Sequence, residues 1–245
     1  MKQSIFTIQE NIALTDSVYQ MTLSGATSHI TCPGQFVNIK LDGLFLRRPI
    51  SVCDSREGNL TIIYKVVGKG TEQMSGMKAG TELDILTGLG NGYDLSSCGE
   101  KVLLLGGGVG VPPLYMLAKE LLKAGKKVSV VLGFNTKAEV FYEKEFADLG
   151  ADVTVTTADG SYGVKGFVTD AIKNMNYTYF YTCGPEPMLK AIYNVSVTSG
   201  QYSFEERMGC GFGACMGCSC KTVTGYKRIC KDGPVLRKEE ILWEN

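Results

Sequence analysis

Four cysteines in the last quarter of the chain have the spacing of iron–sulfur ligands. They form the pattern C-x4-C-x2-C…C, with members Cys210, Cys215, Cys218 and Cys230. Plant-type [2Fe–2S] centres use this spacing, in which one tight loop supplies three thiolates and a later segment supplies the fourth. Three glycines inside the loop let the backbone bend, because glycine tolerates positive φ. The pattern predicts a [2Fe–2S] cluster and therefore one-electron chemistry.

Two alternatives concern these thiols. A structural zinc site also uses four cysteines, but zinc modules usually pair two C-x2-C knuckles, and the candidate ligands contain one. Cys220 competes with Cys230 for the fourth position. We expect Cys230, because Cys218 and Cys220 would crowd one side of a cluster, whereas Cys230 arrives from across a turn near Gly225. Cys220 is then a small buried side chain.

A glycine-rich loop indicates a nucleotide site. Residues 106–113 read GGGVGVPP and lie between a predicted strand and a predicted helix, where backbone amides can face a pyrophosphate. The spacing departs from G-x-G-x-x-G, and no acidic residue ends the next strand. A tight turn without a ligand is therefore an alternative. The turn at residues 183–188 (CGPEPM) ends another predicted strand and strengthens the nucleotide interpretation.

Composition limits the classes of protein. The 245 residues are 44% hydrophobic, and 25 basic side chains balance 25 acidic ones, so the charge gives no reason to expect a nucleic-acid partner. Disulfide frameworks belong to short secreted chains, and MKQSIFTIQEN lacks the apolar core of a signal peptide. We expect a cytoplasmic protein. The longest apolar stretch, 102–118, is interrupted by four glycines and two prolines, which argues against a membrane span.

The chain divides into three predicted regions: 1–97, 98–203 and 204–245. The first has short strand-like runs between glycine-rich turns, typical of an antiparallel β-barrel or sandwich, at residues 4–9, 18–23, 35–41, 60–67 and 82–86. The second alternates strands with helices and predicts a parallel α/β sheet. Its strands are expected at 102–105, 128–132, 152–156 and 177–182, and its helices at 113–124, 142–149 and after Pro185. The third region holds the cysteines.

Four motifs in order carry a family resemblance. They are RPIS at residues 48–51, the GGGVGVPP loop, the CGPEPM turn and the cysteine tail. The first three resemble the ferredoxin–NADP reductase superfamily over nearly the whole chain. In that family R-x-[YF]-[ST] on a β-barrel holds the flavin; here Ile50 replaces the usual aromatic residue. With this variant, the cysteine tail and CKDGP at 230–234, the chain resembles a narrower family, the electron-transfer subunit of class 1B dihydroorotate dehydrogenase.

The resemblance implies two nucleotide sites. It places FAD at Arg48, Pro49, Ile50, Ser51, Ile63, Tyr64, Lys65, Gly70 and Thr71. Arg48 would pair with the pyrophosphate, and Ser51 would lie near flavin N5. Judged without the family, the simpler interpretations are a surface ion pair for Arg48 and barrel packing for Tyr64. NAD would lie at Gly107, Gly108, Gly110, Cys183 and Gly184.

The implied cofactors determine the implied function. NAD exchanges two electrons at a time and the cluster exchanges one, whereas FAD can do either and so belongs between them. This chemistry needs no set of acid–base residues. The single histidine, His29, is expected in a loop. In the family, dihydroorotate reacts on a partner chain that binds FMN in a barrel. Such a barrel needs about 250 residues, for which the three regions leave no room. The resemblance implies half of a pyrimidine-biosynthesis enzyme, with a heterotetramer of two copies of each subunit.

Two other functions stay open at this point. One is the small subunit of another iron–sulfur flavoprotein reductase, of the ferredoxin-dependent NADP transhydrogenase or sulfide dehydrogenase type. The other is a zinc-stabilised binding module without redox activity. NAD is expected rather than NADP, because the sequence has no obvious arginine cluster for a 2′-phosphate.

Overall fold

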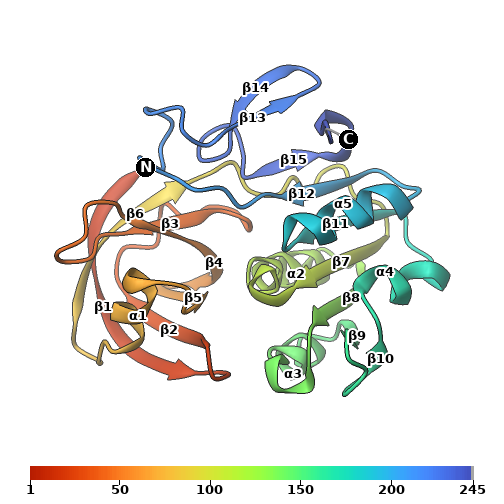
Figure 1. Cartoon of the computed structure of the whole chain (residues 1–245), viewed down its shortest axis with the longest axis horizontal. Coiled ribbons are helices and arrows are strands. Elements are labelled where there is room, and N and C mark those ends of the chain that lie inside the picture. The colour runs from red at the N-terminus through yellow and green to blue at the C-terminus, as the bar shows by residue number, and fades with distance from the viewer. Residues whose placement is uncertain (244–245) are drawn as a thin grey trace.

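The computed structural model describes residues 1–243. A barrel at the N-terminal end stands beside an α/β sheet, and the C-terminal segment lies across the top of both (Figure 1). The predicted order of an antiparallel barrel and then a parallel sheet is confirmed. No helix in the described part is long and apolar enough to cross a lipid bilayer.

Six antiparallel strands close the barrel in the order β1-β2-β5-β4-β3-β6. Their bounds are β1 Lys2–Ala13, β2 Val18–Ser24, β3 Phe36–Ile39, β4 Arg48–Arg56, β5 Asn59–Lys65 and β6 Glu82–Leu89. Apolar side chains fill the interior, because successive residues of a strand point to opposite faces. The sequence prediction missed β4 and the short helix α1, Lys69–Ser75, which precedes β6.

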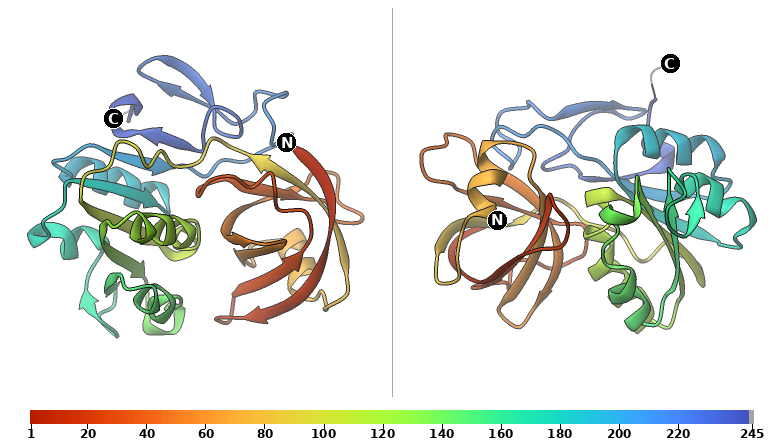
Figure 2. Two further views of the ribbon diagram at one scale, coloured as in Figure 1. Left: turned by 180° about the vertical axis from the view of Figure 1, so that it is seen from behind. Right: turned by 60° about the horizontal axis from the view of Figure 1, so that its bottom comes forward.

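The second sheet runs β10-β9-β8-β7-β11-β12-β15 and is parallel up to β12. Its parallel strands are β7 Lys101–Gly107, β8 Lys127–Phe134, β9 Asp152–Thr157, β10 Val164–Lys165, β11 Tyr179–Cys183 and β12 Gly200–Ser203. The helices are α2 Pro113–Lys123, α3 Glu143–Asp148, α4 Val168–Ala171 and α5 Glu186–Val195. Helices α2 and α3 cover the face toward the barrel, and α4 and α5 cover the other (Figures 1 and 2).

Four single 3-10 turns join these elements: η1 Gly108–Gly110, η2 Lys137–Glu139, η3 Ile172–Asn174 and η4 Lys238–Glu240. The C-terminal segment adds a hairpin, β13 Ser219–Thr222 and β14 Gly225–Arg228, and then β15 Val235–Arg237. Strand β15 pairs antiparallel with β12, so the third region completes the sheet of the second. The boundaries near 97 and 203 stay predictions, and residues 244–245 of the third region lie outside the described residues.

Apolar cores cross the borders between the regions. One contains Val18 and Ile63 of the barrel together with α2 and α3; another joins Phe36 of the barrel to α5 and to Cys218 and Cys230. Polar contacts reinforce the first border, where Lys119 Nζ lies 2.5 Å from Asp54 Oδ2. The barrel, sheet and cysteine segment are therefore packed as neighbours rather than joined by linkers alone.

Candidate functional site

The four predicted cysteine ligands converge as two pairs. The amide of Cys215 donates to Cys210 Sγ at 3.4 Å, and the amide of Cys230 donates to Cys218 Sγ at 3.4 Å. Within residues 1–243 no three His, Cys, Asp or Glu side chains form a group that could hold a single ion. Two thiol pairs are the donor set that a [2Fe–2S] cluster requires, two for each iron. The residues fit this group.

Backbone amides of the loop point at its sulfur atoms. Cys210 Sγ accepts from Ala214 at 3.2 Å, and Cys215 Sγ accepts from Gly217 at 3.5 Å. Burial alone would raise the pKa of the Cys210 thiol, but hydrogen bonds from the amides of Phe212, Cys215 and Ala214 and from the Cys215 side chain lower that pKa to about 6. Burial and the adjacent Cys218 raise the pKa of Cys230. Cys210 is thus prepared as the thiolate, the form that binds iron.

The loop is held in place from both sides. Arg228 binds Asp232 through its guanidinium at 2.8 Å and donates to the Gly213 carbonyl at 3.0 Å. On the barrel side, Asn38 Nδ2 donates to the Cys210 carbonyl at 3.3 Å. A Cβ on Gly211 would lie 2.3 Å from this amide nitrogen, so the close approach requires glycine there.

Cys220 lies on β13, beyond the loop, and is half-buried. Burial raises the pKa of its thiol. The β13–β14 hairpin turns before Gly225 and leads to Cys230, as expected from the sequence. This position agrees with the predicted structural role of Cys220, which stays a prediction.

The glycine loop and the CGPEPM turn meet at the carboxyl ends of neighbouring strands β7 and β11. A Cβ on Gly110 would lie 2.3 Å from the Cys183 carbonyl oxygen and 2.5 Å from Gly184 Cα. A Cβ on Gly107 would meet Met188 Sδ at 2.5 Å, and Gly108 has φ +51°. The two loops therefore lie side by side, and their role as one nucleotide site stays a prediction.

Both loops line a cavity of about 620 Å³ between the sheet and the barrel. Thr156 lies in its wall, fully buried, and its hydroxyl has no hydrogen-bond partner among the described residues. Gly133 also lines the cavity, and a Cβ there would lie 2.6 Å from Val168 Cγ1, so this part of the wall requires glycine. An open cradle with an unpaired buried hydroxyl fits a nucleotide that brings its own polar groups.

Two carboxylates at this cavity were missed by the sequence analysis. Glu139 of η2 accepts from the amide and side chain of Asn135, at 3.2 and 2.9 Å, and so supplies the acidic group that the end of β8 lacks in sequence. Glu205 follows β12 and lies at the cavity rim; its surface is accessible, but packing around the carboxyl desolvates it and raises its pKa. Neither has a local sequence signal, because each reaches the cavity through the fold.

The RPIS motif begins β4 beside helix α1. The guanidinium of Arg48 lies so close over Gly70 that a Cβ there would be 2.2 Å from Nε. Arg48 donates to the Leu46 carbonyl and contacts no carboxylate in the described part of the chain. The hydroxyl of Thr71 caps α1, accepting from the Val67 amide at 2.9 Å and donating to the Gly68 carbonyl at 3.0 Å. Arg48, Gly70 and Thr71 thus meet at one place on the barrel.

The remaining predicted flavin residues point in different directions. Pro49, Ile50 and Ser51 follow Arg48 on β4 and are half-buried. On β5, Ile63 packs toward α2, Tyr64 points into the barrel with its hydroxyl 3.0 Å from Asn11 Oδ1, and Lys65 lines the cavity. Burial raises the pKa of Tyr64 to about 12. The structure therefore brings Lys65 to the nucleotide cavity and turns Tyr64 away from it.

Comparisons with known proteins agree with this geometry. Residues 205–242 match the iron–sulfur cluster binding domain of dihydroorotate dehydrogenase B, and residues 104–194 match the oxidoreductase NAD-binding domain. A dihydroorotate dehydrogenase B (NAD(+)) electron transfer subunit from Fusobacterium nucleatum is 46% identical, covering 98% of this chain and 99% of its own. The corresponding subunit from a Geobacillus strain is 44% identical, covering 99% of both.

Solved structures show the same architecture. An NADH-dependent reduced ferredoxin-NADP oxidoreductase, studied for flavin-based electron bifurcation, has a TM-score of 0.88 and 32% identity, with 97% of this chain and 90% of that chain covered. A ferredoxin NADP+ reductase from Neisseria gonorrhoeae with bound FAD and NADP has a TM-score of 0.70 at 17% identity, with 79% and 90% covered, and shows the fold alone.

Fold and site together define an oxidoreductase of the ferredoxin-reductase type with an added iron–sulfur module. Within that class, the chain belongs to the family of dihydroorotate dehydrogenase B electron transfer subunits. The bifurcating reductase represents the alternative reductase considered from the sequence. It shares the fold, at a lower identity than the dihydroorotate dehydrogenase subunits.

Proposed function

We propose that this chain carries electrons between NAD and a separate dihydroorotate-oxidising subunit, through FAD and a [2Fe–2S] cluster of its own. The observation that supports this most is the contact between the cysteine loop and the strand pair β3–β4. Asn38, which donates to the Cys210 carbonyl, is the β-sheet partner of Pro49 in the RPIS motif. A flavin held by that motif and a cluster held by that loop would share one short stretch of barrel.

FAD is proposed to lie along β4, with its pyrophosphate at Arg48 and the first turn of α1. The support is the unpaired guanidinium over Gly70, since a buried or half-buried arginine without a carboxylate is suited to phosphate oxygens. Ser51, further along β4, would lie near the redox-active ring. Of the β5 residues proposed to line the flavin, Lys65 also lines the cavity proposed for NAD and would therefore lie where the two nucleotides meet.

NAD is proposed to occupy the 620 Å³ cavity. Gly107, Gly108 and Gly110 would let its pyrophosphate approach the backbone, and Cys183 and Gly184 would lie near the nicotinamide. Glu139 supports NAD rather than NADP, because a carboxylate at the end of the second strand can bind a ribose 2′-hydroxyl and repels a 2′-phosphate.

Cys210, Cys215, Cys218 and Cys230 are proposed to hold the cluster. When bound, the cluster supplies one-electron transfer, and FAD divides the electron pair of NADH. The thiol loop carries exposed apolar side chains, Phe212 and Met216, 43% and 54% exposed, which would meet the partner. That partner is proposed to be the FMN-containing catalytic subunit, in a complex of two copies of each chain located in the cytoplasm.

The test compares Cys230→Ser with Cys220→Ser, a matched change of a neighbouring thiol, in protein purified with its catalytic partner. We expect Cys220→Ser to keep the electron paramagnetic resonance signal of the reduced cluster and the dihydroorotate-dependent reduction of NAD. Cys230→Ser should lose or alter the signal and lose that reaction, while NADH still bleaches the flavin band. A normal signal in Cys230→Ser together with a lost signal in Cys220→Ser would reverse the ligand assignment.

A further inference from the structure

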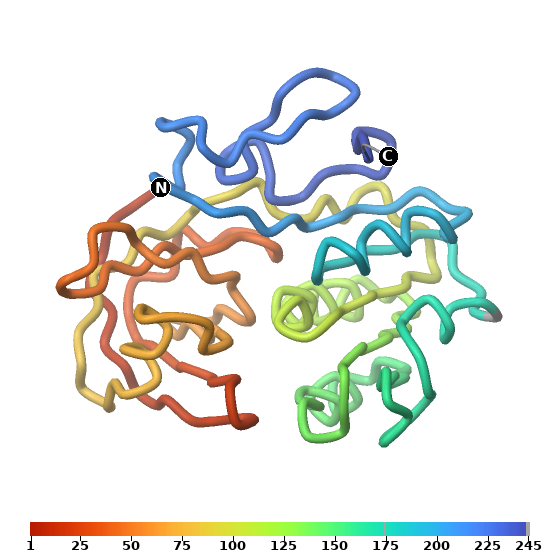
Figure 3. Tube along the Cα trace, viewed as in Figure 1, coloured from red at the N-terminus to blue at the C-terminus, as the bar shows by residue number. Residues whose placement is uncertain are grey.

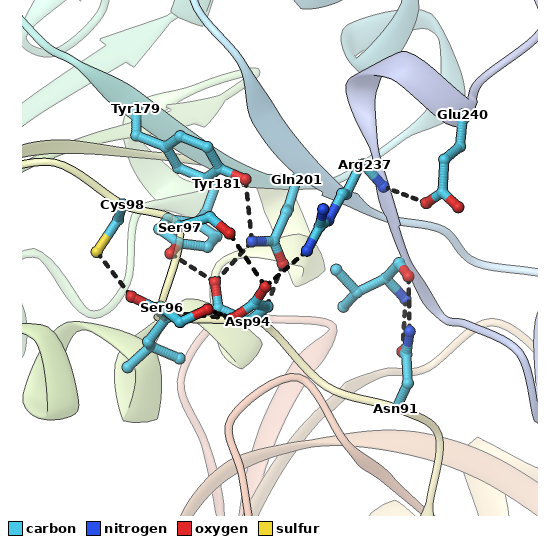
Figure 4. A network of polar contacts seen from close by, with 12 residues as sticks. Asn91, Asp94, Ser96, Ser97, Cys98, Tyr179, Tyr181, Gln201, Arg237 and Glu240 are labelled. Atoms are coloured by element: carbon cyan, nitrogen blue, oxygen red, sulfur yellow. Dashed lines mark hydrogen bonds and ion pairs between the residues drawn. The ribbon is translucent and has the colours of Figure 1, made fainter.

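The segment between the barrel and the sheet lies against the C-terminal chain over much of its length. It leaves β6 at Gly90 and reaches β7 at Lys101, next to the chain that follows Cys230 (Figure 3). We call residues 90–98 the crossover segment. Two of its polar side chains, Asn91 and Asp94, contact different partners (Figure 4). Neither belongs to the motifs assigned to a cofactor.

Asn91 binds the backbone just beyond Cys230 with both ends of its amide. Its Nδ2 donates to the Val235 carbonyl at 2.8 Å and to the Asp232 carbonyl at 3.3 Å, and its Oδ1 accepts from the Val235 amide at 3.1 Å. The backbone N–H of Asn91 donates to the Gly233 carbonyl at 2.7 Å. Four hydrogen bonds thus fix residues 232–235 to the end of the barrel.

Asp94 binds the sheet instead. Gln201 of β12 is buried; it accepts from the Asp94 amide at 2.9 Å and donates to the Asp94 carbonyl at 2.6 Å. Tyr181 of β11 donates to the same carbonyl at 2.9 Å. The Asp94 carboxylate also accepts from Arg237 of β15 at 2.9 Å, in a pair that is largely exposed. The crossover segment is therefore fixed to the sheet at Asp94 and to the cysteine segment at Asn91.

The segment that Asn91 holds is rigidly joined to the thiols. Asp232 binds the Arg228 guanidinium, and Arg228 donates to the Gly213 carbonyl inside the cysteine loop. Cys230 lies between Arg228 and Asp232, and the residue is 2% exposed. Any shift of residues 232–235 would be transmitted to the buried thiol pair of Cys218 and Cys230, and to water access at that pair.

We infer that Asn91 is a positioning residue for electron transfer, which fixes the inner thiol pair relative to the barrel and keeps water from it. The inference rests on the proposed function, because it takes Cys230 as a ligand. Groups around a metal centre that orient its ligands typically change activity by roughly ten- to hundredfold when removed. Water access stabilises the more negative, reduced state of a cluster and so raises its reduction potential.

The experiment uses the full chain with its catalytic partner and follows the flavin and cluster absorption bands after mixing with NADH. In Asn91→Ala we expect unchanged flavin reduction, a roughly ten- to hundredfold slower reduction of the cluster, and a raised midpoint potential. Asn91→Asp keeps the acceptor for the Val235 amide, so its cluster reduction rate and midpoint potential should lie between those of wild type and Asn91→Ala. The aspartate variant replaces Asn91→Ala in the test if the alanine variant does not fold. Arg237→Gln, which loosens the exposed end of the same segment, is the control and should match wild type.

Wild-type cluster kinetics and potential in Asn91→Ala would overturn the inference. It is equally refuted if Arg237→Gln gives the same defect as Asn91→Ala, because the effect would then be general loosening of the sheet edge. Failure of the proposed function looks different: Cys230→Ser would keep a normal cluster signal, whatever Asn91 does.

Discussion

Two adjacent arginines offer a test of the flavin site in which each variant controls for the other. Arg47 forms a two-pronged ion pair with Asp84, with Nη2 3.0 Å from both carboxylate oxygens, and Nη1 donates to the Asp84 carbonyl at 2.9 Å. Arg48 has no carboxylate partner in residues 1–243 and lies over Gly70. The first side chain therefore serves the fold, and the second is free to bind phosphate.

The two substitutions should change different quantities, FAD affinity in Arg48→Ala and thermal stability in Arg47→Ala. Replacing Arg48 by alanine removes a charge-assisted contact of about 1.5–3 kcal/mol, which lowers FAD affinity roughly ten- to hundredfold. Breaking a buried ion pair by removing one partner costs about 3–5 kcal/mol. The Arg47 and Asp84 side chains are each 20% exposed, and water screening reduces the cost of Arg47→Ala to about 2–3 kcal/mol. In a chain of this size that corresponds to a fall in Tm of roughly 4–12 °C.

The assay is titration of flavin-free protein with FAD by fluorescence quenching, together with thermal unfolding of the same flavin-free samples. Arg48→Ala should bind FAD weakly and unfold at the wild-type temperature. Arg47→Ala should bind FAD normally once folded and unfold earlier. Unchanged FAD affinity in Arg48→Ala would refute the assignment of its guanidinium to the pyrophosphate. If FAD binding is weakened only in Arg47→Ala, the pyrophosphate contact would have to be assigned to Arg47 instead of Arg48.

Two further predictions concern the nucleotide and acid stability. In stopped-flow experiments NADH should reduce the flavin faster than NADPH does. Glu139→Gln should lower the ratio of the NADH rate to the NADPH rate by roughly tenfold, or about 1.4 kcal/mol. An unchanged ratio of the two rates argues against a role for this carboxylate. Hydrogen bonds from the Ser96 hydroxyl and amide lower the pKa of Asp94 to about 2, below its ordinary value of 3.8. The stabilisation by the Asp94 carboxylate is therefore full above about pH 4 and is lost as the pH falls toward 2. The free energy of unfolding in urea should consequently fall less steeply with pH in Asp94→Asn than in the wild type across that window. An equal dependence on pH in the two proteins would contradict this.

Features encoded in short stretches of sequence were predictable. The cysteine spacing indicated the ligand loop because three of its members lie within nine residues. The glycine loop and the CGPEPM turn were recognisable because parallel strands place their carboxyl ends at one edge of a sheet. Gly110 then explains why the two loops need small residues, since the Cys183 backbone lies against it.

Features that depend on distant pairing were not predictable. Strand β4 begins with Arg-Pro and contains Asp54, a composition unfavourable for a strand, and it forms because β3 and β5 pair with it. Strand β15 has three residues and exists only as the partner of β12. Asn91 follows the same rule, because its hydrogen-bond partners lie more than 140 residues away and leave no local signal in the sequence.

The two thiol pairs differ in their surroundings, and this gives the site a direction. Cys218 and Cys230 are 2% exposed and belong to the core shared with the barrel and the sheet, whereas Cys215 lies at the surface. Water stabilises added negative charge far better than an apolar core does. We therefore expect the transferred electron to be most stable at the outer pair of Cys210 and Cys215. That pair lies beside the exposed Phe212 and Met216, so electrons taken from dihydroorotate would enter the cluster at the face proposed for the catalytic partner and pass on toward the barrel.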